Sequence, residues 1–339
     1  MTSTLKKLTA LAAITLGSLS LASAPSLASD KMPGEGVTLK MAQADWDTGW
    51  FQARIYKQIF EKLGYKVDGP TTLNVPSFYS AVSTGDVDFW VNGWFPTQQP
   101  FVDQAKDQIS VIGNSIPKGG IMGFMADKAG VEKYGITSLN DFKKPEVRKA
   151  YDRNGDGKAD LVSCQLGWKC EVRIANIIKN LGLTDDVNII HAKYTAAFAD
   201  AEAAYKAGEH IAFYNWTPNW TFQELVPGKD VVWIEIPDNK EISDPLKLDL
   251  GDECATNPCQ IGFKASDIQP VANNDFIKKN PAAAEILREV KIPVADVNAQ
   301  NAAMHGGNTD FDAQAKAWIK QHQDEVNGWL DAARAAAKK

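Results

Sequence analysis

The sequence predicts an α/β fold with largely parallel sheets, divided into two lobes that share a ligand-binding cleft. Short apolar stretches alternate with amphipathic ones through the first two thirds of the chain, which is typical of sheets covered by helices. Two similar segments, GDVDFWVNGWFP at residues 85–96 and GEHIAFYNWTP at residues 208–218, each end an apolar strand with Asn, Trp and Pro. In open α/β sheets, ligands bind at the carboxyl ends of strands, so we expect each segment to present a tryptophan to the cleft.

The first β-α-β unit begins at residue 36. GVTLKMA at residues 36–42 is typical of a buried strand, and YKVDG at residues 65–69 begins the next strand. Between them the spacing predicts a helix that Asp47 caps and Gly64 ends. Four apolar residues lie four apart on one face of this helix: Phe51, Ile55, Ile59 and Leu63.

The same pattern recurs along the chain and then gives way to helices. Helical segments precede apolar strands three more times: SFYSAVSTG before VDFWVNG, CEVRIANIIKNLG before VNIIHA, and AFADAEAAYKAG before HIAFYNW. The last third contains two helical stretches, residues 280–290 and 312–339. One stripe of the second stretch is expected to pack against the rest of the protein, and it contains Trp318, His322, Val326 and Trp329.

Residues 1–28 have the pattern of a secretion signal. MTSTLKK forms its positive start, LTALAAITLGSLSL its apolar part, and small residues precede a cleavage site after Ala28. The first cysteine is Cys164, so no cysteine near the cleavage site is available for a lipid anchor. We therefore expect a periplasmic bacterial protein and, since no long apolar run follows, no membrane insertion.

Composition argues against several classes of function. The formal net charge is −6, and an acidic chain without basic clusters is not expected to bind nucleic acid or anionic lipid. The chain has four histidines, but no glycine-flanked nucleophilic serine and no His-Glu pair spaced for zinc. We therefore expect a binding protein that is not an enzyme and that requires no cofactor.

The four cysteines fall into two closely spaced pairs. Cys164 with Cys170 and Cys254 with Cys259 are spaced for two small local disulfide loops, as expected in an exported chain. A four-thiolate zinc site is the alternative interpretation.

One of these loops contains a third tryptophan of interest. Trp168 lies between Cys164 and Cys170, immediately before a predicted helix whose first backbone N–H groups lack partners and attract anions. Together with Trp94 and Trp216 it predicts a pocket for a zwitterion. Indole faces would hold a quaternary ammonium group by cation–π attraction, and the amides would hold a carboxylate.

Four segments carry a resemblance to a known family: DRNGDGKADLVSCQLGWKCE, HIAFYNWTPNW, PGKDVVWIEIP and KIPVADVNAQNAAMH. Over nearly all of its mature length the chain resembles the glycine betaine/proline betaine-binding proteins of osmoprotectant ABC importers. The resemblance implies a two-lobed, type II-like periplasmic binding protein fold with the ligand in the interlobe cleft. We place residues 29–120 and 263–339 in lobe 1 and residues 121–262 in lobe 2. The protein is expected to act as a monomer and to deliver its ligand to an inner-membrane permease and its ATPase.

The resemblance also implies which residues bind the ligand. The family encloses a trimethylammonium group between three tryptophans, and the matching positions are Trp94, Trp168 and Trp216. The carboxylate is expected at the backbone N–H groups of Lys169 and Cys170, and at Gln98, where the family has histidine. Choline, a sulfonium compound or another quaternary amine is the alternative ligand. An exported sugar-binding module with aromatic platforms is the alternative function.

DRNGDGKAD at residues 152–160 resembles the start of a calcium loop. Four of its residues fall at ligand positions of such a loop: Asp152, Asn154, Asp156 and Asp160. Ser163 stands where a bidentate glutamate belongs. A structural calcium ion is one interpretation of this segment, and an Asx-rich turn is the other.

Overall fold

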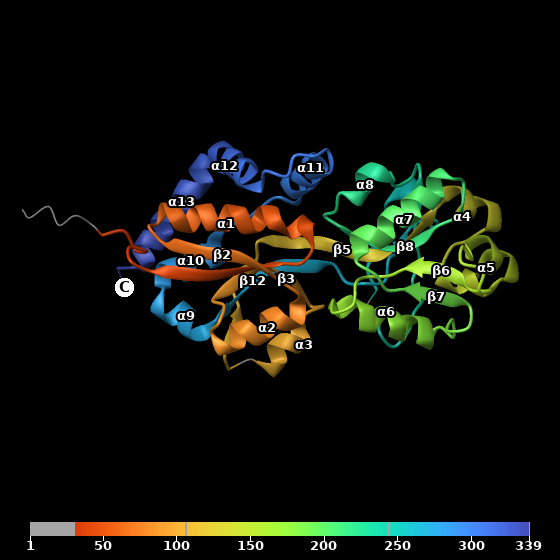
Figure 1. Ribbon diagram of the computed structural model, residues 1–339, viewed down its shortest axis with the longest axis horizontal. Helices are drawn as coiled ribbons and strands as arrows, with labels where there is room; N and C mark the ends of the chain where they lie inside the picture. Colours follow the sequence, from red (N-terminus) through yellow and green to blue (C-terminus); the bar gives the residue numbers. More distant parts are fainter. Residues whose placement is uncertain (1–30, 106, 243–244, 339) are drawn as a thin grey trace, which may run out of the picture. The chain divides into compact units, whose positions relative to one another are not determined.

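The computed structural model describes residues 31–105, 107–242 and 245–338. The predicted secretion signal, residues 1–28, lies outside these residues. Met32–Lys339 form one compact unit, whose elements are drawn in Figure 1.

Strands of this unit form one large sheet and one small ladder. The large sheet contains β1 (Thr38–Ala44), β2 (Lys66–Leu73), β3 (Phe89–Phe95), β4 (Ile109–Val111), β5 (Ile116–Asp127), β6 (Ala159–Val162), β7 (Val187–Ile190), β8 (Ala212–Thr217), β9 (Val231–Ile234) and β12 (Ser266–Asn273). The strand order is β2-β1-β3-β12-β5-β8-β6-β7, with β4 beside β12 and β9 beside β5. The small ladder pairs β10 (Lys247–Leu248) with β11 (Cys259–Gln260).

Parallel pairing is confined to the two ends of the large sheet. β1 is parallel to β2 and β3, and β6 is parallel to β7 and β8. Between these ends, β5 and β12 run antiparallel to each other and to their neighbours. The sequence predicted mostly parallel pairing because the β-α-β pattern reports only on the two ends, whereas β5 and β12 connect them.

Helices cover both faces of the sheet. They are η1 (Asp47–Gly49), α1 (Trp50–Lys62), α2 (Val75–Thr84), α3 (Gln99–Gln104), α4 (Lys128–Tyr134), η2 (Leu139–Lys143), α5 (Pro145–Tyr151), α6 (Lys169–Asn180), α7 (Tyr194–Lys206), α8 (Thr221–Glu224), η3 (Gly251–Glu253), α9 (Asn274–Lys279), α10 (Pro281–Glu289), α11 (Val294–His305), α12 (Phe311–Gln321) and α13 (Gln323–Ala336). In Figure 1, α1 and α2 lie on opposite faces of the strands β1 and β3, and α7 and α6 flank β6 and β8 in the same way.

The first predicted helix forms with its apolar face buried, but its start differs from the prediction. Phe51, Ile55 and Ile59 are buried, and Gly64 follows the helix with a φ of 87° in the left-handed region. The turn η1 precedes α1, and no side chain caps either of them. Asp47 therefore does not cap this helix; its side chain lines a cavity instead.

The predicted C-terminal helix is divided into α12 and α13. The break falls at His322, whose φ of −104° and ψ of 32° interrupt the helix. His322 stacks on Trp318 with ring centroids 4.1 Å apart, and its Nδ1 lies 3.0 Å from the Trp318 carbonyl oxygen. Trp318 is buried, and its Nε1 donates a 2.8 Å hydrogen bond to Asp296. The regular spacing of apolar residues therefore continues from α12 into α13, so the spacing alone does not show that the helix is interrupted between them.

The segment that resembles a calcium loop is an Asx-rich turn. The Asp152 carboxylate accepts three backbone N–H groups from within the loop at 2.7–3.1 Å, and Asp160 accepts two more at 3.0 and 3.2 Å. These oxygens are directed at the backbone of their own loop. Across the residues that the structure describes, no group of three or more Asp, Glu, His or Cys side chains is arranged to hold a metal ion. The calcium interpretation is not supported for Asp152, Asn154, Asp156 and Asp160.

Candidate ligand-binding site

Three tryptophans from separate elements line one buried pocket. Trp94 lies near the end of β3, Trp216 lies near the end of β8, and Trp168 directly precedes α6. The rings of Trp168 and Trp216 meet edge to face with centroids 5.4 Å apart. The structure therefore brings together the three indoles that the sequence singles out.

A glycine makes room for the first of these rings. Gly120 of β5 lies against the indole of Trp94, and a Cβ at this position would come within 2.5 Å of the ring. β12 lies between β3 and β5, with Ile268 opposite Trp94, so the indole reaches across β12 to the backbone of β5. A side chain at position 120 would displace the indole from its place in the pocket.

The other walls of the pocket are mostly apolar. They are formed by Trp46, Val75, Thr97, Gln98, Met122, Lys169, Cys170 and Tyr214. None of the described lining residues is acidic. Burial raises the pKa of Tyr214, so its hydroxyl is neutral at physiological pH.

Trp46 is a fourth indole of the pocket, and the sequence analysis did not single it out. Its ring meets that of Trp168 edge to face, with centroids 5.5 Å apart. The Oδ1 atom of buried Asn92 accepts hydrogen bonds from the Nε1 atoms of both Trp46 and Trp94, each 2.9 Å long. One signal was present in the sequence: Trp46 follows the end of β1, just as Trp94 and Trp216 lie at the ends of their strands.

A carboxylate and a disulfide loop hold Trp168 in place. Its Nε1 donates to Oδ1 of Asp45 at 2.9 Å, and Nε2 of Gln165 donates to Oδ2 of the same carboxylate at 3.1 Å. A disulfide joins Cys164 to Cys170 and closes the loop that contains Trp168. Burial raises the pKa of Asp45, and the hydrogen bond from Trp168 opposes this shift.

Hydrogen-bond donors for an anion also lie at this pocket. Trp168 is the N-cap residue of α6 and no side chain caps this helix, so the N–H groups of Lys169 and Cys170 have no acceptor within the helix. Tyr79 donates a 3.0 Å hydrogen bond to Oε1 of Gln98, which leaves Nε2 of Gln98 as a donor. The pocket can therefore hold a cation against its indole faces and an anion at its amides.

The second disulfide lies apart from these residues. It joins Cys254 to Cys259, and neither cysteine belongs to the described lining of the pocket. Both disulfides have the pairing that the cysteine spacing predicted.

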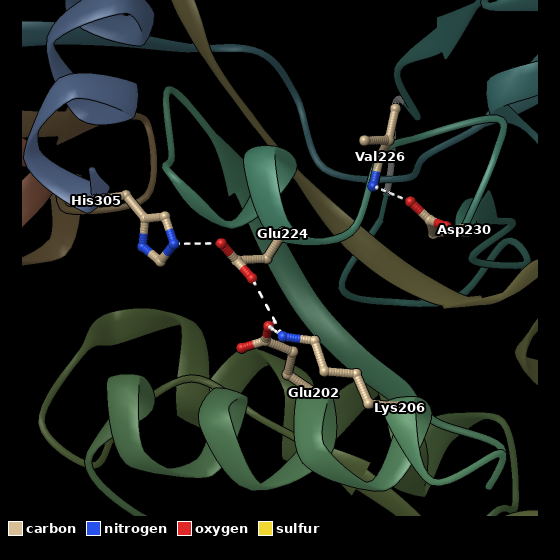
Figure 2. A network of polar contacts seen from close by, with 6 residues as sticks. All are labelled: Glu202, Lys206, Glu224, Val226, Asp230 and His305. Carbon is tan, nitrogen blue, oxygen red and sulfur yellow. Dashed lines mark hydrogen bonds and ion pairs between the residues drawn. The ribbon is translucent and has the colours of Figure 1, made fainter.

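A polar network joins α11 to α7 and α8. Figure 2 shows Glu224 of α8 between His305 of α11 and Lys206 of α7. Lys206 also contacts Glu202 one turn earlier in α7. The imidazole of His305 stacks on Trp220 with centroids 4.9 Å apart and planes 4° from parallel.

A pocket with indole walls and amide donors, set among the strand ends of an α/β sheet, is that of a solute-binding protein. The chain belongs to the family described as the substrate binding domain of ABC-type glycine betaine transport systems, which matches residues 37–321. It is 38% identical to the glycine betaine-binding periplasmic protein OusX of Dickeya dadantii (strain 3937), over 96% of this chain and 98% of that protein. It is 35% identical to the glycine betaine/proline betaine-binding periplasmic protein of Escherichia coli (strain K12), over 94% of this chain and 96% of that protein.

Solved structures share the fold. Lactococcal OpuAC in its closed-liganded conformation, complexed with glycine betaine, aligns with a TM-score of 0.67 at 18% identity, covering 87% of this chain and 99% of that chain. This likeness confirms the predicted two-lobed α/β fold. Within the part of the chain that the structure describes, no helix combines the length and apolar character needed to cross a membrane.

Proposed function

We propose that this protein captures glycine betaine and similar betaines in a tryptophan cage and delivers them to an ABC importer for osmoprotection. The observation that carries the proposal is the pocket of Trp94, Trp168 and Trp216 beside the N–H groups of Lys169 and Cys170. A quaternary ammonium group has no N–H to donate, so π faces are its practical partners. The described lining contains no acidic side chain, as expected where the ligand supplies its own negative charge.

The donors of the pocket favour a betaine over choline and over sugars. The carboxylate of glycine betaine would accept hydrogen bonds from the backbone N–H groups and from Gln98, and it would balance the charge of Lys169. Choline has no anionic group, so these donors would lose water without gaining an acceptor of equal strength. A sugar needs several Asp, Asn or Arg partners, and none lies among the described lining residues.

We further propose that residues 29–120 and 263–339 form one lobe and residues 121–262 the other. The sheet register supports this division, because Gly120 of β5 pairs with Ser266 of β12, whereas the next residue, Ile121, pairs with Thr217 of β8. Trp94 would then belong to the first lobe, and Trp168 and Trp216 to the second. Binding would close the two lobes on the ligand.

We also propose where the protein acts and which macromolecules it contacts. The names of the relatives and the pattern of residues 1–28 support a periplasmic location after cleavage near Ala28. The protein would act there as a monomer and without catalysis, and its macromolecular partners would be the importer's permease and ATPase.

Competition between ligands tests the proposed function. Tryptophan fluorescence and calorimetric titrations would compare glycine betaine, choline, a sulfonium betaine and maltose. Glycine betaine should bind most tightly, and affinity should fall stepwise through dimethylglycine to glycine, as the ammonium group gains N–H donors that the cage cannot satisfy. Equal binding of glycine and glycine betaine would contradict the cage. If choline or maltose bound more tightly than glycine betaine, the protein would be assigned to that class of ligand instead.

A further inference from the structure

Two of the three cage tryptophans, Trp168 and Trp216, also line a second cavity. Trp46, Trp168 and Trp216 contribute to both spaces, and the second cavity has a volume of about 150 Å³ against about 50 Å³ for the betaine pocket. The remaining walls of the second cavity are formed by Asp45, Asp47, Trp50, Gln165, Lys193, Tyr194, Thr195 and Trp220. The two spaces therefore share indole walls but differ in charge: the second has two carboxylates, and the first has none among its described lining residues.

These two carboxylates are half-buried and not fully neutralised. Asp45 accepts hydrogen bonds from the neutral donors of Trp168 and Gln165. Asp47 lies beside α1 without capping it. Among the described residues that line this cavity, Lys193 is the one basic side chain, so one negative charge is left over.

Burial makes this excess charge costly. It raises the pKa of both Asp45 and Asp47, although hydrogen bonds from the indoles of Trp168 and Trp220 oppose the shift. A cation that entered the cavity would stabilise the ionised carboxylates. The surrounding indole faces would attract the same charge.

We infer that the second cavity binds a small organic cation that carries N–H groups, such as a primary alkylammonium ion, at the same time as the cage holds a betaine. N–H groups match the acceptors of Asp45 and Asp47, whereas a quaternary ammonium ion would leave these acceptors without donors. A metal ion fits less well, because indole walls supply no oxygen ligands. The two cavities thus select cations by opposite criteria, one by the absence of N–H groups and the other by their presence.

Calorimetric titration with methylammonium chloride tests this inference. The protein is first saturated with glycine betaine, so that the cage is filled, and sodium chloride at equal ionic strength serves as the reference. We expect methylammonium to bind with a stoichiometry of about one, and tetramethylammonium to bind at least about tenfold more weakly. An absence of methylammonium binding, or tighter binding of tetramethylammonium, would overturn the inference.

Two variants assign that binding to this cavity. Asp47→Asn should weaken methylammonium binding about tenfold and leave the affinity for glycine betaine within about twofold, because Asp47 lines only the second cavity. Trp50→Leu should also weaken methylammonium binding, since Trp50 lines that cavity alone. Asp252→Asn removes an exposed acid outside both cavities and should change neither affinity.

The variants also separate this inference from the proposed function. Methylammonium binding that is unchanged in Asp47→Asn would place the cation elsewhere and overturn the inference. Glycine betaine is titrated by itself in every variant, so failure of the cage would be visible as weak betaine binding in the unmodified protein.

Discussion

The Nε1 atom of Trp168 lies 2.9 Å from Oδ1 of Asp45, a residue 123 positions earlier in the chain. This hydrogen bond joins the segment after β1 to the start of α6. It orients one ring of the proposed cage through a carboxylate that does not itself line the betaine pocket. The geometry of the pocket therefore depends on a contact outside it.

Removing this carboxylate should weaken betaine binding. We expect Asp45→Ala to reduce the affinity for glycine betaine about tenfold or more, because a hydrogen bond to a charged group contributes about 1.5 kcal/mol or more. Asp45→Asn keeps an acceptor for Trp168 and should recover most of the loss. Calorimetric titration gives both values. Wild-type affinity in Asp45→Ala would mean that the disulfide loop alone orients Trp168.

Trp216 should contribute directly to the affinity for the cation. A well-placed ring contributes on the order of 1–2 kcal/mol, so Trp216→Ala should weaken glycine betaine binding roughly 5- to 30-fold. Trp216→Phe keeps a smaller π face and should recover part of the loss. Trp220→Ala is the matched control, because Trp220 stacks on His305 and does not line the betaine pocket. Trp220→Ala should lower stability more than it lowers affinity. If Trp216→Ala weakens glycine betaine binding by less than about threefold, the proposed cage is contradicted.

The two disulfides offer a matched comparison within one chain. Replacing Cys164 and Cys170 by alanine should lower both stability and betaine affinity, because that loop holds Trp168 and the first N–H groups of α6. Replacing Cys254 and Cys259 should lower stability by a similar amount, about 2–3 kcal/mol, and leave the affinity unchanged. Thermal unfolding and calorimetric titration of the two double variants test this. Equal effects on affinity would contradict a specific role of the Cys164–Cys170 loop in orienting Trp168.

Glu224 should contribute to stability in a pH-dependent way. Burial and the neighbouring Glu224 carboxylate raise the pKa of Glu202, so the Glu202 carboxyl is the one that keeps a proton and donates it to Glu224 in a hydrogen bond. This hydrogen bond, together with contacts to His305 and Lys206 (Figure 2), holds the pKa of Glu224 below its ordinary value of 4.5. A carboxyl group whose pKa is lowered by folding stabilises the protein above its unfolded pKa and loses this effect as the pH falls through its folded pKa. Glu224→Gln should therefore lower Tm at neutral pH, and the difference from wild type should shrink below pH 4.5.

A surface pair provides the control for this measurement. Glu132 is exposed and forms an i,i+4 pair with the partly buried Lys128, and Glu132→Gln should change Tm little at any pH. A Tm difference for Glu224→Gln that grows in acid would contradict the assigned direction of the pKa shift.

Local patterns in the sequence were enough to predict several structural features of this protein. Apolar spacing predicted the buried face of α1, including Ile55 and Ile59, because side chains four apart fall on one helix face. Cysteine spacing predicted both disulfide pairs, because only a few residues separate the partners. Motifs of contiguous residues were enough to predict the two-lobed fold and the family, both of which the comparisons confirm.

The tertiary structure decided the contacts between distant segments. It placed Trp46 in the pocket and made Asn92 the common acceptor for Trp46 and Trp94. In the folded protein the Asp45 carboxylate also accepts a hydrogen bond from Trp168, and Asp47 lines a second cavity instead of capping a helix. The strands β5 and β12 are antiparallel and lie between the parallel ends of the sheet. Periodicity reports only on neighbours along the chain. Which donor meets which acceptor across 46 or 123 residues depends on how β1, β3 and α6 pack together.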